Sequence, residues 1–219
     1  MISVVLQTTG DEEALVGTLA SLVPAAAEGA VRDVVVVDGG SNPGIPKIAE
    51  GAGCAYIKGP SAREQRLSRG AEAAKGPWLF FLAPGVEPEE SWSRDARQFI
   101  ERAERKGLAG ARAATFRIAF DDGRGLWHRV FGPPSGAYGL LIHRSFYKSL
   151  GGFRQLPAVE YVDLVRRIGP TRLTRLRSVL FVTERAGSNP ELGSGLRRVL
   201  GFGLLTLRVP ARVVARLYS

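Results

Sequence analysis

The residues best suited to chemistry follow two apolar runs near the start of the chain. Residues 33–37 read Asp-Val-Val-Val-Val and lead directly into Asp38-Gly39-Gly40, while an earlier apolar run ends in Gln-Thr8-Thr9. An all-valine run predicts a strand buried on both faces, and an acidic residue before two glycines predicts a tight loop open to a ligand. Asp38 can accept a hydrogen bond from a nucleobase N–H or a ribose hydroxyl, and Gly39 has no Cβ in the way. The alternative is that Asp38 stabilises only its own turn.

Strands and helices alternate along the chain, and this alternation places the two loops. It predicts strands at residues 2–7, 33–37, 54–57, 78–82, 109–120, 126–131, 138–142 and 173–182, and helices at 11–23, 46–50, 61–75, 89–105, 145–150 and 159–168. We therefore expect an α/β fold in which a doubly wound, mostly parallel sheet carries helices on both faces. The extended runs at 109–120 and 126–131 read as a hairpin-like excursion. Ligands of such sheets bind at the carboxyl ends of the strands, where Thr8 and Asp38 fall.

Composition and charge narrow the class of protein. The chain has 219 residues, a net charge of +9 and a pI near 10.3, so its partners are expected to carry phosphate. The sequence contains no known nucleic-acid-binding motif beside its positive charge, so nucleic acid is not the expected partner.

We expect a single domain over residues 1–194. The lone Cys54 is interpreted as a buried small hydrophobe in a reducing compartment.

Residues 195–219 combine leucine and valine with arginine, and are expected to form a basic amphipathic helical segment. Such a helix can lie on an anionic membrane surface, where each basic residue contributes about 1 kcal/mol. It can equally cover an edge of the domain's own sheet. No secretory leader or spanning segment is expected, so the predicted location is cytoplasmic, with a peripheral position on the inner face of the cell membrane left open.

Several fragments in this order resemble glycosyltransferase family two, in its small bacterial branch of the GT-A fold. They are residues 2–8 (ISVVLQT), 35–41 (VVVDGGS), 78–82 (WLFFL) and 150–153 (LGGF), with Glu160 and Asp163-Leu164 behind them. The resemblance covers nearly the whole chain. It implies a nucleotide-diphosphate sugar as the donor substrate, with Asp38 and Gly39 at the base or ribose and the Thr8-Thr9 backbone near the nucleotide. Arg63 or Arg66 would reach the diphosphate, because guanidinium suits phosphate oxygens. The alternative for both is a solvated helix face.

Three positions depart from the family pattern. Where the family has Asp-x-Asp or His-Ala-Asp to hold a divalent cation, this chain has Ala83-Pro84-Gly85, with no side-chain oxygen. Glu87 is the nearby substitute, but nothing in the spacing directs it inward. We therefore expect no metal site. A second departure is Gly136-Ala137-Tyr138, which stands where the family has Gly-Asp-Gln. The remaining departure concerns the catalytic base.

The catalytic Glu-Asp pair of the family is replaced by Glu160-Tyr161. A neutral phenol is a poor base at pH 7, because its pKa is near 10. Glu160 remains, and Asp163 lies three residues on, so the two carboxylates share one helical face and either can act as the general base.

Three function hypotheses follow. The first is an enzyme that transfers a sugar from a nucleotide-diphosphate sugar to a lipid or polyol acceptor without the usual metal. The second is an inactive binding or scaffold protein with the GT-A shell, docked at a membrane surface. A nucleotidyltransferase ranks last, because residues 7–12 are acidic where that class has a basic phosphate loop.

Overall fold

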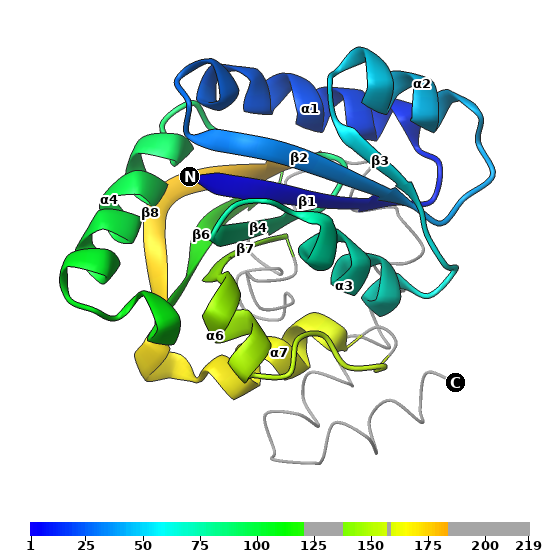
Figure 1. The fold of residues 1–219 in the computed structure, drawn as a ribbon. Coiled ribbons are helices and arrows are strands. Elements are labelled where there is room, and N and C mark those ends of the chain that lie inside the picture. The colour runs from blue at the N-terminus through cyan, green and yellow to red at the C-terminus, as the bar shows by residue number, and fades with distance from the viewer. Residues whose placement is uncertain (121–137, 157–158, 184–219) are drawn as a thin grey trace.

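The computed structural model describes residues 1–120, 138–156 and 159–183 (Figure 1). Its elements in chain order are β1 (Ile2–Thr8), α1 (Glu12–Ala27), β2 (Val31–Asp38), α2 (Gly44–Gly51), β3 (Ala55–Lys58), α3 (Arg63–Ala73), β4 (Trp78–Leu82), β5 (Val86–Pro88), α4 (Trp92–Arg105), η1 (Ala109–Ala111), β6 (Ala113–Phe120), β7 (Gly139–His143), α6 (Arg144–Ser149), α7 (Glu160–Ile168), η3 (Pro170–Arg172) and β8 (Leu173–Val182).

The strands form one mixed sheet in the order β3-β2-β1-β4-β7-β6-β8-β5. The half that contains β3, β2, β1 and β4 is parallel throughout. β7 then runs antiparallel to both β4 and β6, while β6 and β8 are parallel, and β5 closes the far edge antiparallel to β8. The expected α/β fold with a mostly parallel sheet is therefore confirmed.

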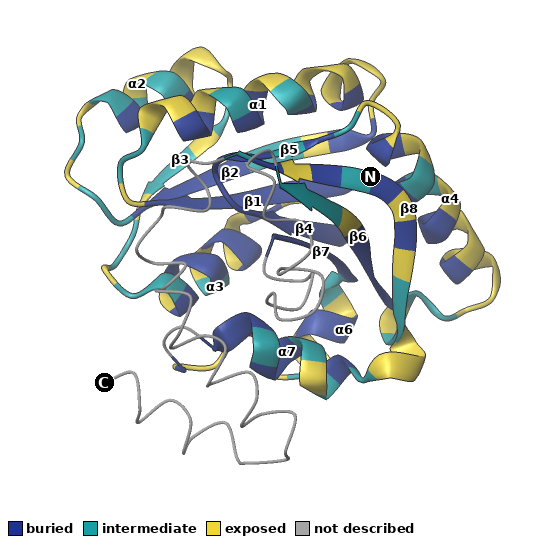
Figure 2. Cartoon of the chain, turned by 180° about the vertical axis from the view of Figure 1, so that it is seen from behind, coloured by how far each residue is buried: buried dark blue, intermediate teal, exposed yellow. Residues whose placement is uncertain are grey.

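Helices cover both faces of this sheet. Figures 1 and 2 show α1 and α2 over one face of β1 to β3, and α3, α6 and α7 over the other. Every residue of β1 and β4 is buried, which explains why these strands read as apolar runs without alternation. Trp92 of α4 packs on Phe80 with ring centroids 4.9 Å apart, and Phe99 packs edge-on against Trp78.

The first helix shows how the local sequence sets the loop after β1. Asp11 caps α1 by accepting a hydrogen bond from the backbone N–H of Ala14 at 3.0 Å, and two glutamates occupy the first turn. Acidic groups at a helix N-terminus complement the partial positive charge there. Leu15, Leu19 and Leu22 are buried against the sheet. The Asp11 cap and the buried leucines therefore fix where α1 begins. The loop between β1 and α1 is short, and it lies beside the end of β2.

Some expectations changed or could not be compared. β3 ends at Lys58 rather than Ile57, and the three-residue edge strand β5 was not expected. The run at 126–131, expected to form a hairpin with 109–120, lies outside the described residues, as do Ala137 and the segment 195–219. Among the helices within residues 1–120, 138–156 and 159–183, none has the length and apolarity that crossing a membrane requires.

A glycine in α3 sets the distance between this helix and the sheet. A Cβ added at Gly70 would lie 2.3 Å from Cγ1 of Val5, a buried side chain of the central strand. We expect Gly70→Ala to lower the free energy of unfolding by about 1–2 kcal/mol, because overpacking outweighs the better helix propensity of alanine. Urea unfolding measures this change.

Gly51→Ala is the matched control, since Gly51 also lies in a helix but an added Cβ there would meet no atom within 4 Å. This variant should unfold at the same urea concentration as the wild type or at a higher one. Equal stability of the Gly70→Ala and Gly51→Ala variants would contradict the close packing of α3 on β1.

Candidate functional site

The ends of three parallel strands form a row at the carboxyl edge of the sheet. Thr8 of β1 pairs with Asp38 of β2, and Asp38 pairs in turn with Lys58 of β3. The ladder continues one step further, since the N–H of Gly39 donates to the Thr8 carbonyl at 2.9 Å and that of Gly59 donates to the Asp38 carbonyl at 2.8 Å. Thr8, Asp38 and Gly39, proposed from sequence as one site, therefore lie next to each other.

The Asp38 carboxylate lies at the centre of this row and is completely buried. Its Oδ1 accepts the N–H of Gly40 at 2.8 Å, while Oδ2 accepts the Tyr56 hydroxyl at 3.2 Å and the Lys58 ammonium at 3.1 Å. The turn-stabilising role considered from the sequence is thus real for Oδ1, whereas Oδ2 faces side chains of β3. Partial burial, followed by the charge of Asp38, raises the pKa of Tyr56, so the phenol stays a donor.

The two glycines after Asp38 are required by contacts within the protein. A Cβ on Gly39 would lie 2.4 Å from Nη1 of Arg66, and a Cβ on Gly40 would lie 2.3 Å from the Thr9 carbonyl oxygen. The sequence had suggested room for a ligand here. The structure places protein atoms in that room, so these glycines first of all bring the loops after β1, β2 and β3 together.

Asn42 joins the loops that follow β1 and β2. Its Nδ2 donates to the Gly10 carbonyl at 2.9 Å, and its Oδ1 accepts the N–H of Gly44 at 2.9 Å. Thr8 helps from the other side, because its hydroxyl accepts the N–H of Gly10 at 3.1 Å. Thr9 between them is exposed. Asn42 was not among the residues predicted from the sequence. The Asn-Pro pair that follows Gly-Gly-Ser is a turn signal that could have indicated it.

Arg66 is fully buried, so a solvated helix face is wrong for this residue. Its Nε and Nη2 donate to Oε1 of Gln7 at 3.0 and 2.7 Å, and its Nη1 donates to the carbonyls of Pro60 and Ser61. These bonds join α3 to the end of β1. The expectation that Arg66 contacts a diphosphate stays a prediction, and the structure adds a positioning role for it.

Arg63, one turn earlier in α3, reaches across to α7. Its Nη1 lies 3.2 Å from Oε1 of Glu160, and its guanidinium carbon lies 5.3 Å from the ring centroid of Tyr161. The Arg63 side chain is only 10% exposed, which also overturns the solvated alternative for it. Glu160 is buried, and within the described residues its Oε2 has no hydrogen-bond partner.

Tyr161 occupies the position where the family resemblance implies an aspartate. Burial raises its pKa well above the usual value for a phenol, the charge of Arg63 acts in the opposite direction, and Glu160 adds to the rise. The side chain is therefore a neutral phenol at physiological pH. This agrees with the expectation that it cannot act as a base.

Asp163 has a different environment from Glu160. Its Oδ2 binds Arg167, with Nη2 at 2.6 Å and Nε at 2.8 Å, and its Oδ1 lies 3.6 Å from Arg154. Arg167 also donates to the carbonyls of Leu150 and Gly152. Asp163 therefore fastens α7 to the glycine-rich loop after α6, and the structure does not bring it to the Arg63 contact.

The turn Ala83-Pro84-Gly85 is packed into the protein. Gly85 N–H donates to the Ala14 carbonyl at 3.0 Å and to the Thr18 hydroxyl at 2.9 Å, and its carbonyl accepts the N–H of Thr183 at 3.0 Å. Residues 83–85 are all buried. The segment that would carry cation-binding carboxylates is thus a buried turn against α1.

A divalent cation does not fit the residues present at this turn. It has no side-chain oxygen, and Oε1 of the nearby Glu87 lies 2.5 Å from where Gly17 of α1 would carry a Cβ. Across the described parts of the chain, no group of three His, Cys, Asp or Glu side chains could hold a metal ion. Hard cations take oxygen ligands, and at phosphate sites Mg²⁺ is usually held by one or two carboxylates beside the phosphates, which this turn does not supply.

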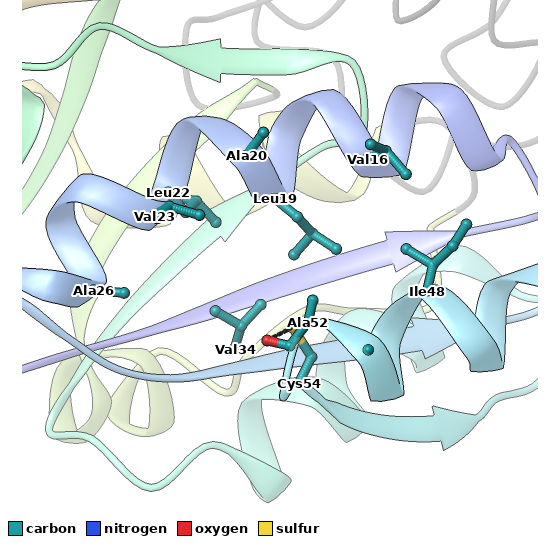
Figure 3. Close-up of a pocket in the computed structure, with 11 residues that line it drawn as sticks. Val16, Leu19, Ala20, Leu22, Val23, Ala26, Val34, Ile48, Ala52 and Cys54 are labelled. Atoms are coloured by element: carbon teal, nitrogen blue, oxygen red, sulfur yellow. Dashed lines mark hydrogen bonds between the residues drawn. The ribbon is translucent and has the colours of Figure 1, made fainter.

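An apolar groove of about 340 Å³ lies elsewhere, between α1 and α2 (Figure 3). It is lined by Val16, Leu19, Ala20, Leu22, Val23, Ala26, Val34, Ile48, Gly51, Ala52 and Cys54. Cys54 is half-buried there, less than the sequence suggested, and partial burial raises the pKa of its thiol. No charged side chain lines this groove, so it offers a phosphate neither a guanidinium nor an ammonium group.

Several solved structures share the architecture of this chain. S. aureus TarS 1-349 aligns with a TM-score of 0.64 at 16% identity, over 92% of this chain and 63% of that chain. The same protein in complex with UDP aligns at 0.63 and 16%, over 97% and 68%. Glucosyl-3-phosphoglycerate synthase from Mycobacterium tuberculosis, in complex with Mn²⁺, UDP and glucosyl-3-phosphoglycerate, aligns at 0.62 and 19%, over 96% and 81%.

Identities this low show a shared fold, and the two TarS alignments leave about a third of TarS 1-349 uncovered. The comparison with curated proteins gave no match. The comparison with protein families did, since the model described as glycosyl transferase family 2 matches residues 3–177, most of the described chain. The matched residues include the strand ends at Thr8, Asp38 and Lys58. The chain therefore belongs to glycosyl transferase family 2.

Proposed function

We propose that this protein transfers a sugar from a uridine-diphosphate sugar to a lipid or polyol hydroxyl, without a divalent cation. The observation that carries the proposal is the buried Asp38 carboxylate at the carboxyl edge of the parallel strands, in a family 2 fold. Ligands of open α/β sheets bind at this edge. UDP is chosen because solved proteins with the same fold are in complex with it.

In this proposal the loops after β1 and β2 hold the nucleoside. Asp38 accepts a hydrogen bond from a donor group of the base or the ribose. Thr8, Thr9 and Gly39 contribute the backbone that surrounds the nucleoside. Arg66 keeps this backbone in place through Gln7 and the Pro60 carbonyl. The diphosphate would then lie near the first turn of α3, which carries Arg63 and Arg66.

Glu160 is our candidate for the general base. The proton of the acceptor hydroxyl would move to Oε2, the oxygen without a hydrogen-bond partner in the described structure. The acceptor oxygen would then bond to the anomeric carbon, while the bond from this carbon to the diphosphate oxygen breaks and UDP leaves with the electron pair. Asp163 is the second candidate from the sequence, but two arginines already hold its oxygens.

Arg63 is our candidate for stabilising the departing diphosphate. Fixed cationic donors can stabilise charge that develops on a leaving group. Arg63 lies in the first turn of α3 and is held beside Glu160 at 3.2 Å, so base and cation would flank the same reaction centre.

The second candidate function is a binding or scaffold protein without turnover. The buried turn at Ala83-Pro84-Gly85 and the neutral Tyr161 favour it, because both replace groups that the family resemblance implies for catalysis. For either function we propose one domain over residues 1–194. The basic segment 195–219 would contact an anionic membrane surface from the cytoplasmic side, an inference that rests on sequence charge alone.

Asp38→Ala tests the donor site. Hydrogen bonds to a charged group contribute about 1.5–3 kcal/mol, so the variant should bind UDP at least about tenfold more weakly than the wild type in isothermal titration calorimetry. Asp33→Ala is the control, because Asp33 lies near the start of the same strand and accepts the Ser3 hydroxyl and the Lys75 N–H. Equal affinity of wild type and Asp38→Ala would refute the donor site.

Manganese tests the proposed independence from metal. We expect the same UDP affinity with Mn²⁺ and with EDTA, since Ala83-Pro84-Gly85 supplies no ligand oxygen. Calorimetric titration under both conditions measures this. A gain of about tenfold or more with Mn²⁺ would show that a carboxylate such as Glu87 has taken over the cation, contrary to the proposal.

Glu160→Gln tests the base. General bases typically contribute about 10²–10⁴-fold to rate, so UDP release from UDP-glucose or UDP-N-acetylglucosamine should fall by about that factor. The UDP affinity should stay within about twofold of wild type, since the variant keeps the size of the side chain. Unchanged turnover would remove Glu160 from this role. Wild-type protein that binds UDP but releases none from a donor would favour the scaffold function.

A further inference from the structure

Lys58 occupies the open side of the Asp38 carboxylate. It is the last residue of β3, its ammonium lies 3.1 Å from Oδ2 of Asp38, and it also donates to the Gly40 carbonyl. The Lys58 side chain is 58% exposed, whereas that of Asp38 is 0% exposed. The lysine ammonium therefore contacts a fully buried carboxylate, while more than half of the lysine side chain is exposed to solvent.

Because the Asp38 side chain is fully buried, a ligand can reach its carboxylate only if one of the three groups that now bind it moves away. The Gly40 N–H belongs to the backbone of a loop whose glycines are closely packed, so it is fixed. Tyr56 lies on the same edge strand as Lys58, but it is partly buried and its rigid ring turns about only two side-chain bonds. Lys58 alone of the three has a flexible, largely exposed side chain, so its ammonium can leave without moving the backbone.

We propose that Lys58 is a gate for the nucleoside end of the site: its ammonium must leave Asp38 before a nucleobase or ribose donor can bind there. The inference rests on the proposed function, which it extends by naming the residue that regulates donor entry. The exchange replaces an ion pair with a hydrogen bond from the ligand to the same oxygen, Oδ2.

The cost of opening this gate is small but measurable. Ion pairs of exposed side chains typically contribute about 0.2–1 kcal/mol, and Lys58 is the exposed partner here, so competition from Lys58 should weaken ligand binding about two- to fivefold. Uridine is the best probe for this effect, because it has no phosphate. With UDP, loss of the lysine would also remove an attraction to the diphosphate, and the two effects would oppose each other.

The test compares Lys58→Met with wild type in calorimetric titrations with uridine at low and at high salt. At low salt the variant should bind uridine about two- to fivefold more tightly. At high salt this gain should shrink, because screening weakens the wild-type ion pair. Lys75→Met makes the same charge change near the Asp33 end of β2, and its uridine affinity should equal that of the wild type.

The outcomes separate this inference from the proposed function. If UDP binds both wild type and Lys58→Met but uridine affinity is unchanged or lower in the variant, the gate is refuted and the donor site stands. If neither protein binds UDP or uridine while both give the same melting curve, the proposed function is refuted and the gate with it. Tighter uridine binding by Lys58→Met alone supports both.

Discussion

The candidate site depends on the burial of one guanidinium group, that of Arg66. A buried charge is tolerated only where hydrogen bonds compensate for lost hydration, and Arg66 obtains these bonds from Gln7 and from the carbonyls before α3. The same group fills the space beside Gly39, which explains why this position has no side chain. The ends of β1 and β2 and the start of α3 are thereby held as one rigid unit.

Two carboxylates on α7 show how one helix can divide structural and chemical roles. Glu160 faces α3 and retains an oxygen without a hydrogen-bond partner among the described residues, whereas both oxygens of Asp163 contact arginines on its own side. The three-residue spacing predicts a shared helical face for them, and the structure shows that both are buried. Their partners are set by α3 and by the glycine-rich loop, so the spacing could not distinguish their roles.

Periodicity and apolar runs were enough to predict most of the architecture. β1, β2 and β4 were evident because both of their faces are covered, and β8 was predicted at its observed bounds. The three-residue β5 was missed because it is too short to show a pattern. In the site, Asp38 was found from its strand end and glycines. Lys58 and the Arg63–Glu160 pair were missed because register and long-range contacts create them, and no local pattern encodes either.

The packing of the turn at Gly85 limits which side chains its neighbouring positions can accept. Its N–H and carbonyl are already bound to α1 and to Thr183, and Ala83 is 4% exposed. An aspartate introduced at Ala83 alone would put an uncompensated charge into an apolar environment and would destabilise the folded state. A cation-binding sequence at this turn would therefore need coordinated changes in α1 and at the end of β8, because both already use the backbone groups of Gly85.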